Sequence, residues 1–180
     1  MTQAKTIDVL ILMGSDSDLQ VMKAAGDVLD ELRICWEMSV ASAHRSPDRV
    51  ERIVRDAPRR GVKLFIVGAG AAAHLAGVIA ARTTRPVIGV PIDSSPLSGF
   101  DALLSTVQMP PGVPVATVSV GKSGATNAAV LAAQILALAD ADLARRVVAY
   151  KESLAQKVEQ AAARLDASLA GAAARSTKRS

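Results

Sequence analysis

The segment IDVLILMGSDSD, from Ile7 to Asp18, decides the fold. Its first part, IDVLILM, is predominantly apolar, which is typical of a central strand in a parallel sheet that is covered on both faces. Gly14 then permits a tight turn. The run Asp16 to Asp18 favours the start of a helix. The segment therefore predicts a buried strand that leads directly into a helix.

The same alternation of strand and helix continues along the chain. Further strands are predicted at WEMSVAS (36–42), KLFIVGA (63–69), PVIGVP (86–91) and VATVSVG (115–121). Helices are predicted from about 16 to 32, from Ser46-Pro47 onward, over 74–83, around 100–107 and over 127–139. Ser46 is expected to cap the second of these helices, with Pro47 at its first position. Such βαβ units predict a three-layer, doubly wound α/β domain with a parallel sheet.

An extra long helix is predicted after the last unit, from about 141 to 169. Its apolar residues recur at spacings of three, four or seven and form one stripe: Leu143, Val147, Tyr150, Leu154, Val158 and Leu165. The stripe could pack on another subunit or on its own domain, and the pattern leaves both open. We expect one domain over 1–170, with its core at about 7–139. The final residues, 171–180, are expected to form a basic, disordered tail.

The composition limits the classes of function. Half of the residues are apolar, but only Trp36, Phe65, Phe100 and Tyr150 are aromatic. The core must therefore consist of small aliphatic side chains, which favours helices packed on a sheet. The net charge is +4, and most of it comes from Arg175, Lys178 and Arg179 in the tail. The remainder is almost neutral, so we expect no binding of nucleic acid.

The sequence also bears on the cellular compartment. Cys35 is the only cysteine, which excludes a disulfide or a cysteine-based zinc site within one chain. We expect it to be a buried, reduced thiol. The N-terminus lacks a signal-peptide pattern, and no run of about 18 apolar residues is present. We therefore expect a cytoplasmic protein without membrane contact.

Three polar loops follow predicted strands, where open α/β sheets bind ligands. In GSDSD, Ser15 could hold a phosphate beside free N–H groups of the helix, and Asp18 suits sugar hydroxyls better. Alternatively, Asp16, Ser17 and Asp18 only cap the helix, and the residues alone favour this interpretation. In SAHRSP, Arg45 could pair with a phosphate and Ser42 could add a hydroxyl. His44 could give and take protons at neutral pH, because histidine ordinarily titrates near about 6.5.

The third loop, GAGAAAHL, spans 68–75. It fits the dinucleotide pattern GxGxxG/A, but it follows the third strand and does not open the fold, so we discount that interpretation. The glycines more plausibly let a small planar ligand lie against the backbone, and His74 either orients that ligand or caps the helix. VGKSG at 120–124 lacks the first glycine of a P-loop. Two histidines without a supporting carboxylate motif form a poor metal site, and we expect no metal.

Taken together, these segments resemble the class I N5-carboxyaminoimidazole ribonucleotide mutase family. The similar segments occur in family order: MGSDSD (13–18), SAHRSP (42–47), GAGAAAHLAG (68–77), VQMPPGVPVATVSVG (107–121) and NAAVLAAQIL (127–136). Ala76, Ser46 and Ser119 depart from commoner family residues, but none of these changes removes a reactive group. The resemblance covers about 7–139 and carries no information beyond about Tyr150.

The resemblance implies a flavodoxin-like fold, a homo-octamer and a cofactor-independent isomerase of purine biosynthesis that acts on a ribonucleotide. By position, Ser15, Ser42 and Arg45 would hold the phosphate and Asp18 the ribose. His44 would be the general acid and base. The loop containing Gly70, His74 and Leu75 would line the ring pocket. The loop from Met109 to Pro114 would close over it, from the same subunit or a neighbour.

Two rival functions stay open at this stage. One is an aminoimidazole ribonucleotide carboxylase of the same fold, which uses free carbon dioxide. The other is a nucleotide-binding module without catalysis, which would explain the glycine loops but not the placement of His44.

Overall fold

A computed structural model describes residues 6–177 of the chain, and the side chains of residues 6–169. Its centre is one sheet of five parallel strands: β1 (Val9–Met13), β2 (Trp36–Val40), β3 (Leu64–Gly70), β4 (Val87–Ile92) and β5 (Ala116–Thr117). The strand order is β2-β1-β3-β4-β5. This is the doubly wound, flavodoxin-like order, and it confirms the predicted fold class.

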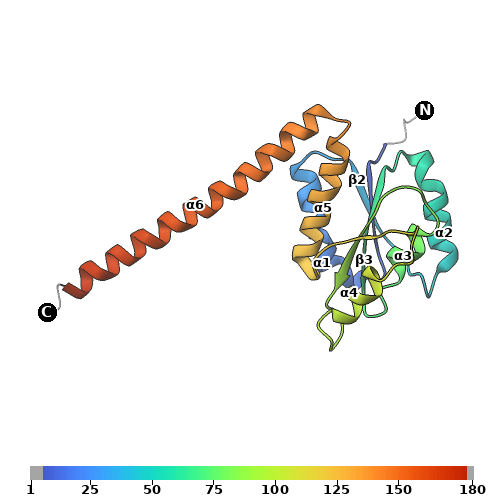
Figure 1. Cartoon of the computed structure of the whole chain (residues 1–180), viewed down its shortest axis with the longest axis horizontal. Helices are drawn as coiled ribbons and strands as arrows, with labels where there is room; N and C mark the ends of the chain where they lie inside the picture. The colour runs from blue at the N-terminus through green and yellow to red at the C-terminus, as the bar shows by residue number, and fades with distance from the viewer. Residues whose placement is uncertain (1–5, 178–180) are drawn as a thin grey trace.

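The strands are joined by helices that cover both faces of the sheet. These are η1 (Asp16–Asp18), α1 (Leu19–Glu31), α2 (Pro47–Asp56), η2 (Ala57–Arg60), α3 (Leu75–Ala80), α4 (Phe100–Val107) and α5 (Gly121–Ala137), followed by α6 (Ala141–Thr177). Figure 1 shows α1 and α5 on one face of the sheet and α2 and α3 on the other. The result is the expected three-layer arrangement.

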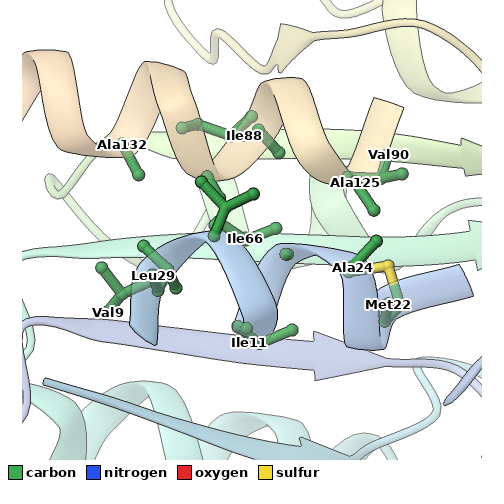
Figure 2. Packing of buried hydrophobic residues seen from close by; sticks show 14 of the residues in the cluster. Val9, Ile11, Met22, Ala24, Leu29, Ile66, Ile88, Val90, Ala125 and Ala132 are labelled. Carbon is green, nitrogen blue, oxygen red and sulfur yellow. The ribbon is translucent and has the colours of Figure 1, made fainter. Parts of the chain in front are cut away.

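Alternation along the strands divides the core between the two faces. Val9 and Ile11 of β1 pack in the cluster beneath α1 and α5, whereas Leu10 and Leu12 pack beneath α2 and α3. Side chains of a strand point to opposite faces in turn, so a strand that is covered on both sides must be apolar throughout. Figure 2 shows the first cluster, where small residues such as Ala125 and Ala132 let α5 approach the sheet and α1 closely.

The last βα unit differs from the prediction. A strand over 115–121 was expected, but β5 contains only Ala116 and Thr117. It is shorter because it is an edge strand that pairs only with β4. α5 begins earlier than expected, at Gly121, which has a φ of 74°. This left-handed conformation is open to glycine at little cost and turns the chain into the helix early.

One local expectation was wrong, and another was confirmed only in part. Cys35 was expected to be buried, but it is exposed, just before the edge strand β2. Ser46 occupies the N-cap position of α2 and Pro47 the first helical position, as predicted, but the Ser46 side chain makes no capping hydrogen bond. Its hydroxyl instead donates to the carbonyl of Ser42 at 3.2 Å.

The long helix α6 combines both of the packing modes that the sequence left open. Leu143 is buried, and Val147 and Tyr150 pack against the core. Beyond them α6 leaves the domain (Figure 1), and Leu154, Val158 and Leu165 are exposed. α6 continues to Thr177, past its predicted end near 169 and into the segment predicted to be disordered. Residues 178–180 of that predicted tail lie outside the described residues.

Within the described part of the chain, no helix is long and apolar enough to cross a membrane.

Candidate functional site

A cleft of about 270 Å³ lies where the strand order reverses, at the carboxyl ends of β1, β2 and β3. It is lined by Gly14, Ser15, Ser17, Asp18, Ser42, Ala43, His44, Arg45, Ala69, Gly70, Ala72, Leu75 and Ser94. Ligands of doubly wound sheets bind at this switch point. The fold therefore gathers the three polar loops of the sequence analysis around one cleft.

Ser15 and Asp18 form a reciprocal cap at the start of η1. The Ser15 amide donates to Asp18 Oδ2 at 3.1 Å, and the Ser17 amide donates to Ser15 Oγ at 3.3 Å. This is the capping box, so the capping interpretation of these residues is correct. Because Asp18 also lines the cleft, capping and ligand binding are compatible roles for the same side chain.

The environment of Asp18 perturbs its ionisation. The side chain is only 6% exposed, and this burial, more than the nearby charge of Asp16, raises the pKa of the Asp18 carboxyl above its ordinary value. Hydrogen bonds from the backbone of Ser15 and Gly14 act in the opposite direction. A buried carboxylate beside a cleft accepts hydrogen bonds from donors such as sugar hydroxyls, whereas an anionic ligand would be repelled by its charge.

His44 and His74 meet at the mouth of the cleft. His44 Nε2 lies 2.9 Å from His74 Nδ1, and the two rings are nearly perpendicular, with centroids 5.0 Å apart. In such a contact one nitrogen must donate and the other must accept, so the two tautomers are coupled. Both rings are exposed, which leaves the remaining nitrogens accessible to a ligand. His74 thus touches the proposed proton-transfer residue itself.

Ser42 and Arg45 are held together by the turn before α2. The Arg45 amide donates to Ser42 Oγ at 3.1 Å, and Arg45 Nη2 donates to the carbonyl of Gly14 at 3.1 Å. The second bond ties the loop after β2 to the loop after β1. The other N–H groups of the guanidinium and the Ser42 hydroxyl proton are available for an anion.

The third side of the cleft is built closely around Gly70. A Cβ atom on Gly70 would lie 1.7 Å from the Oγ of Ser94, so any side chain at this position requires Ser94 to move. Leu75 is 2% exposed and begins α3. Ser94 lines the cleft, and the sequence analysis missed it. Its position just after β4 was the available signal, because the carboxyl ends of all parallel strands meet at one edge.

One predicted segment does not reach this cleft. Met109 approaches Gly77 on α3, and Gly112 and Pro114 line a different cavity together with 83–87. The loop from Met109 to Pro114 therefore does not close the cleft of its own subunit. Among the described residues, no group of three or more His, Cys, Asp and Glu side chains could hold a metal ion.

Comparison with known proteins assigns the family. The sequence model described as AIR carboxylase matches residues 8–157. The chain belongs to the AIR carboxylase family. All of the cleft residues lie within the part that matches the family.

Family relatives agree with this assignment over most of their length. An N5-carboxyaminoimidazole ribonucleotide mutase of Bacillus subtilis is 56% identical over 82% of this chain and 91% of the relative. A mutase of the same name from Thermotoga maritima is 50% identical over 87% and 90% of the two chains. The crystal structure of Treponema denticola PurE has a TM-score of 0.76 at 32% identity and covers 84% of this chain and 94% of that one. The predicted family resemblance is confirmed.

Proposed function

We propose that this enzyme is an N5-carboxyaminoimidazole ribonucleotide mutase, an isomerase that converts its carbamate substrate to the isomer carboxylated at ring carbon 4. The observation that carries the proposal is the meeting of His44 with His74, 2.9 Å apart, beside a cleft lined by a guanidinium and several hydroxyl groups. Relatives that are about half identical bear this name. A module for binding alone would need no such pair.

The cleft residues suit the parts of a ribonucleotide. In this proposal Arg45, Ser42 and Ser15 hold the phosphate, since they offer a guanidinium and two hydroxyls from neighbouring loops. Asp18 accepts hydrogen bonds from the ribose. Gly70 and Leu75 contact the flat ring, because a missing Cβ and an apolar side chain leave a smooth wall.

His44 serves as acid and then as base in the proposed reaction. Protonated His44 gives its proton to the carbamate nitrogen, the C–N bond breaks, and its electron pair stays on nitrogen as carbon dioxide leaves. Carbon 4 of the freed aminoimidazole then attacks the carbon dioxide and forms the new C–C bond. Neutral His44 removes the proton from carbon 4, which restores the aromatic ring and regenerates the acid. His74 orients the His44 ring through their hydrogen bond.

The reaction requires that carbon dioxide stay next to the ring between the two steps. The cleft within one subunit is open at its mouth, where His44 and Arg45 are exposed. We therefore propose that the loop from Met109 to Pro114 of a neighbouring subunit closes it, in a homo-octamer. Closure would exclude water and hold the carbon dioxide. The absence of any cofactor requirement and the cytoplasmic location stay predictions.

Isotope labelling tests the function and separates the mutase from the carboxylase. The enzyme is incubated with substrate labelled in its carbamate carboxyl, without ATP and with excess unlabelled bicarbonate. A mutase keeps most of the label in the product, because a held neighbour has an effective concentration that dissolved carbon dioxide cannot match. Early product that carries mainly bulk carbon, after correction for spontaneous breakdown of the carbamate, would assign the carboxylase reaction. No product at all would contradict both.

A further inference from the structure

The outer part of α6 carries an apolar stripe that its own domain leaves uncovered. Leu154, Val158, Leu165 and Leu169 are 44%, 66%, 59% and 60% exposed. Figure 1 shows this part of α6 extending away from the sheet and the other helices. The match to the family ends at residue 157, so most of the stripe lies beyond the catalytic domain that the relatives share.

The spacing places these side chains on one face of the helix. Leu154, Val158, Ala161, Leu165 and Leu169 follow one another by three or four residues, which is the period of a helical face. At about 1.5 Å per residue the stripe is roughly 22 Å long. Single exposed apolar residues need no partner, but a continuous row on a projecting helix marks an interaction surface.

Between Leu154 and Leu169, the charges beside the stripe are separated by sign. With about 100° of rotation per residue, Lys157 and Arg164 fall on one side of the stripe, which we call the basic edge. Glu159 and Asp166 fall on the other side, the acidic edge, and Lys151 lies on that side as well, one turn before Leu154. All five residues are exposed. The outward face carries Gln156, Gln160 and Ala163, which require no partner.

This separation of charge determines which partner fits. When two copies of α6 pack stripe to stripe in the same direction, the basic edge of each helix lies against the acidic edge of the other. When the two helices run in opposite directions, the basic edges face each other and the acidic edges face each other, and both pairs repel. We propose that the stripe from Leu154 to Leu169 is covered by α6 of a second copy of this chain, running parallel to it.

The proposed contact between two α6 helices depends on the domains that carry them. Helix pairs this short are marginal in isolation, because few apolar layers offset the cost of ordering. In an assembly of subunits, the domains hold several α6 helices at a high effective concentration, which makes a short contact sufficient. Parallel packing further requires that the rotation axis relating the paired subunits run along the helices.

Disulfide cross-linking of the full chain tests the contact. In a Cys35→Ser background, which removes the exposed native thiol, Leu165→Cys and Leu154→Cys each place one thiol on the stripe. Parallel packing brings identical positions face to face, so both variants form disulfide-linked pairs. We expect each rate to exceed that of the control Ala163→Cys, on the outward face, by at least about 10-fold, since facing thiols have a high effective concentration.

Equal rates for stripe and control overturn the proposal. Linking at only one stripe position overturns parallel packing, because antiparallel helices juxtapose at most one identical pair.

Reversal of the charges tests the direction independently. Lys157→Glu with Arg164→Glu makes both edges acidic, and we expect slower cross-linking at position 165. Adding Glu159→Lys and Asp166→Lys restores opposite edges, and we expect the rate to recover. The loss becomes smaller at high salt, which screens exposed charges. An unchanged rate in the first variant, or no recovery in the second, overturns the assignment of parallel edges.

Discussion

At the scale of the residue, the same cleft side chains both stabilise the loops and face the proposed ligand site. Asp18 caps the first helical turn through the Ser15 amide and also lines the cleft. Arg45 joins the loops after β1 and β2 through the Gly14 carbonyl, while its other N–H groups stay available. Substitutions here must therefore separate loss of structure from loss of binding.

Replacement of His44 tests its role in proton transfer. His44→Asn matches the ring in polarity and approximate reach but cannot titrate, so we expect a folded enzyme that binds ribonucleotide and loses about 100-fold or more in turnover. His74→Phe is the comparison, because it keeps a ring but removes the nitrogen 2.9 Å from His44. We expect a smaller loss, roughly 10-fold, since His44 remains but its orientation is less defined. Near-full turnover of the His44 variant would assign the proton to another group.

Burial of Asp18 predicts a dependence of stability on pH. The pKa of Asp18 is raised in the folded state, mainly by burial, from an ordinary value of 3.8. The folded protein therefore holds this proton more tightly than the unfolded chain. Ionisation of Asp18 then weakens the fold as the pH rises from about 3.8 through the raised pKa.

Asp18→Asn removes this titration and keeps an oxygen that can accept from Ser15. The free energy of unfolding of the native protein, minus that of the variant, is expected to fall with rising pH across that window and then level off. Urea titrations at several pH values measure it. A difference that grows with pH would show that the native charge is net favourable.

At the scale of the element, close approach of the backbone positions α5. A Cβ on Gly124 would lie 1.7 Å from the backbone carbonyl oxygen of Ser119, and a carbonyl of the main chain cannot move aside cheaply. We expect Gly124→Ala to lower the free energy of unfolding by about 1–3 kcal/mol or more, the usual cost of overpacking. Gly77→Ala is the control, because its Cβ meets only the flexible Met109 side chain. Equal urea midpoints for the two variants would contradict this view.

Most elements were predictable from periodicity, and the failures have physical causes. α4 matches its predicted range, and β1 and β3 follow apolar runs that only a doubly covered sheet explains. β5 was overestimated because apolar composition does not reveal that an edge strand has one partner. The start of α5 was missed because it depends on the left-handed turn at Gly121 and on the close approach of Gly124 to Ser119.

The site was predictable to a similar extent. Eight of its residues were expected from loops at strand ends and from the family resemblance, and all line the cleft or touch His44. These are Ser15, Asp18, Ser42, His44, Arg45, Gly70, His74 and Leu75. The direct contact of His44 with His74 could not be predicted, because thirty residues separate them along the chain. Ser94 was missed since it belongs to no distinctive motif.

At the scale of the whole molecule, one subunit leaves too much apolar surface uncovered. Besides the stripe on α6, a second group lies on and before α4, where Leu97, Phe100, Leu104 and Val107 are between 42% and 62% exposed. Exposed groups of this kind mark interfaces between subunits. They support an assembly in which a neighbouring subunit also supplies the loop from Met109 to Pro114.

The last prediction concerns the size of that assembly. Sedimentation equilibrium at micromolar concentration is expected to give eight chains per particle, since the family resemblance implies an octamer and two exposed apolar groups need cover.

Phe100→Ser with Leu104→Ser places polar side chains in the α4 group and is expected to shift the particle toward smaller species. Leu138→Ser is the matched control, because Leu138 is 89% exposed and lies outside both groups, so its particle should keep the native size. Activity should fall together with the mass in the double variant, because a cleft without its neighbour's loop releases carbon dioxide before recapture. A monomer for the native chain would contradict the octamer, and a fully active small species would contradict the shared site.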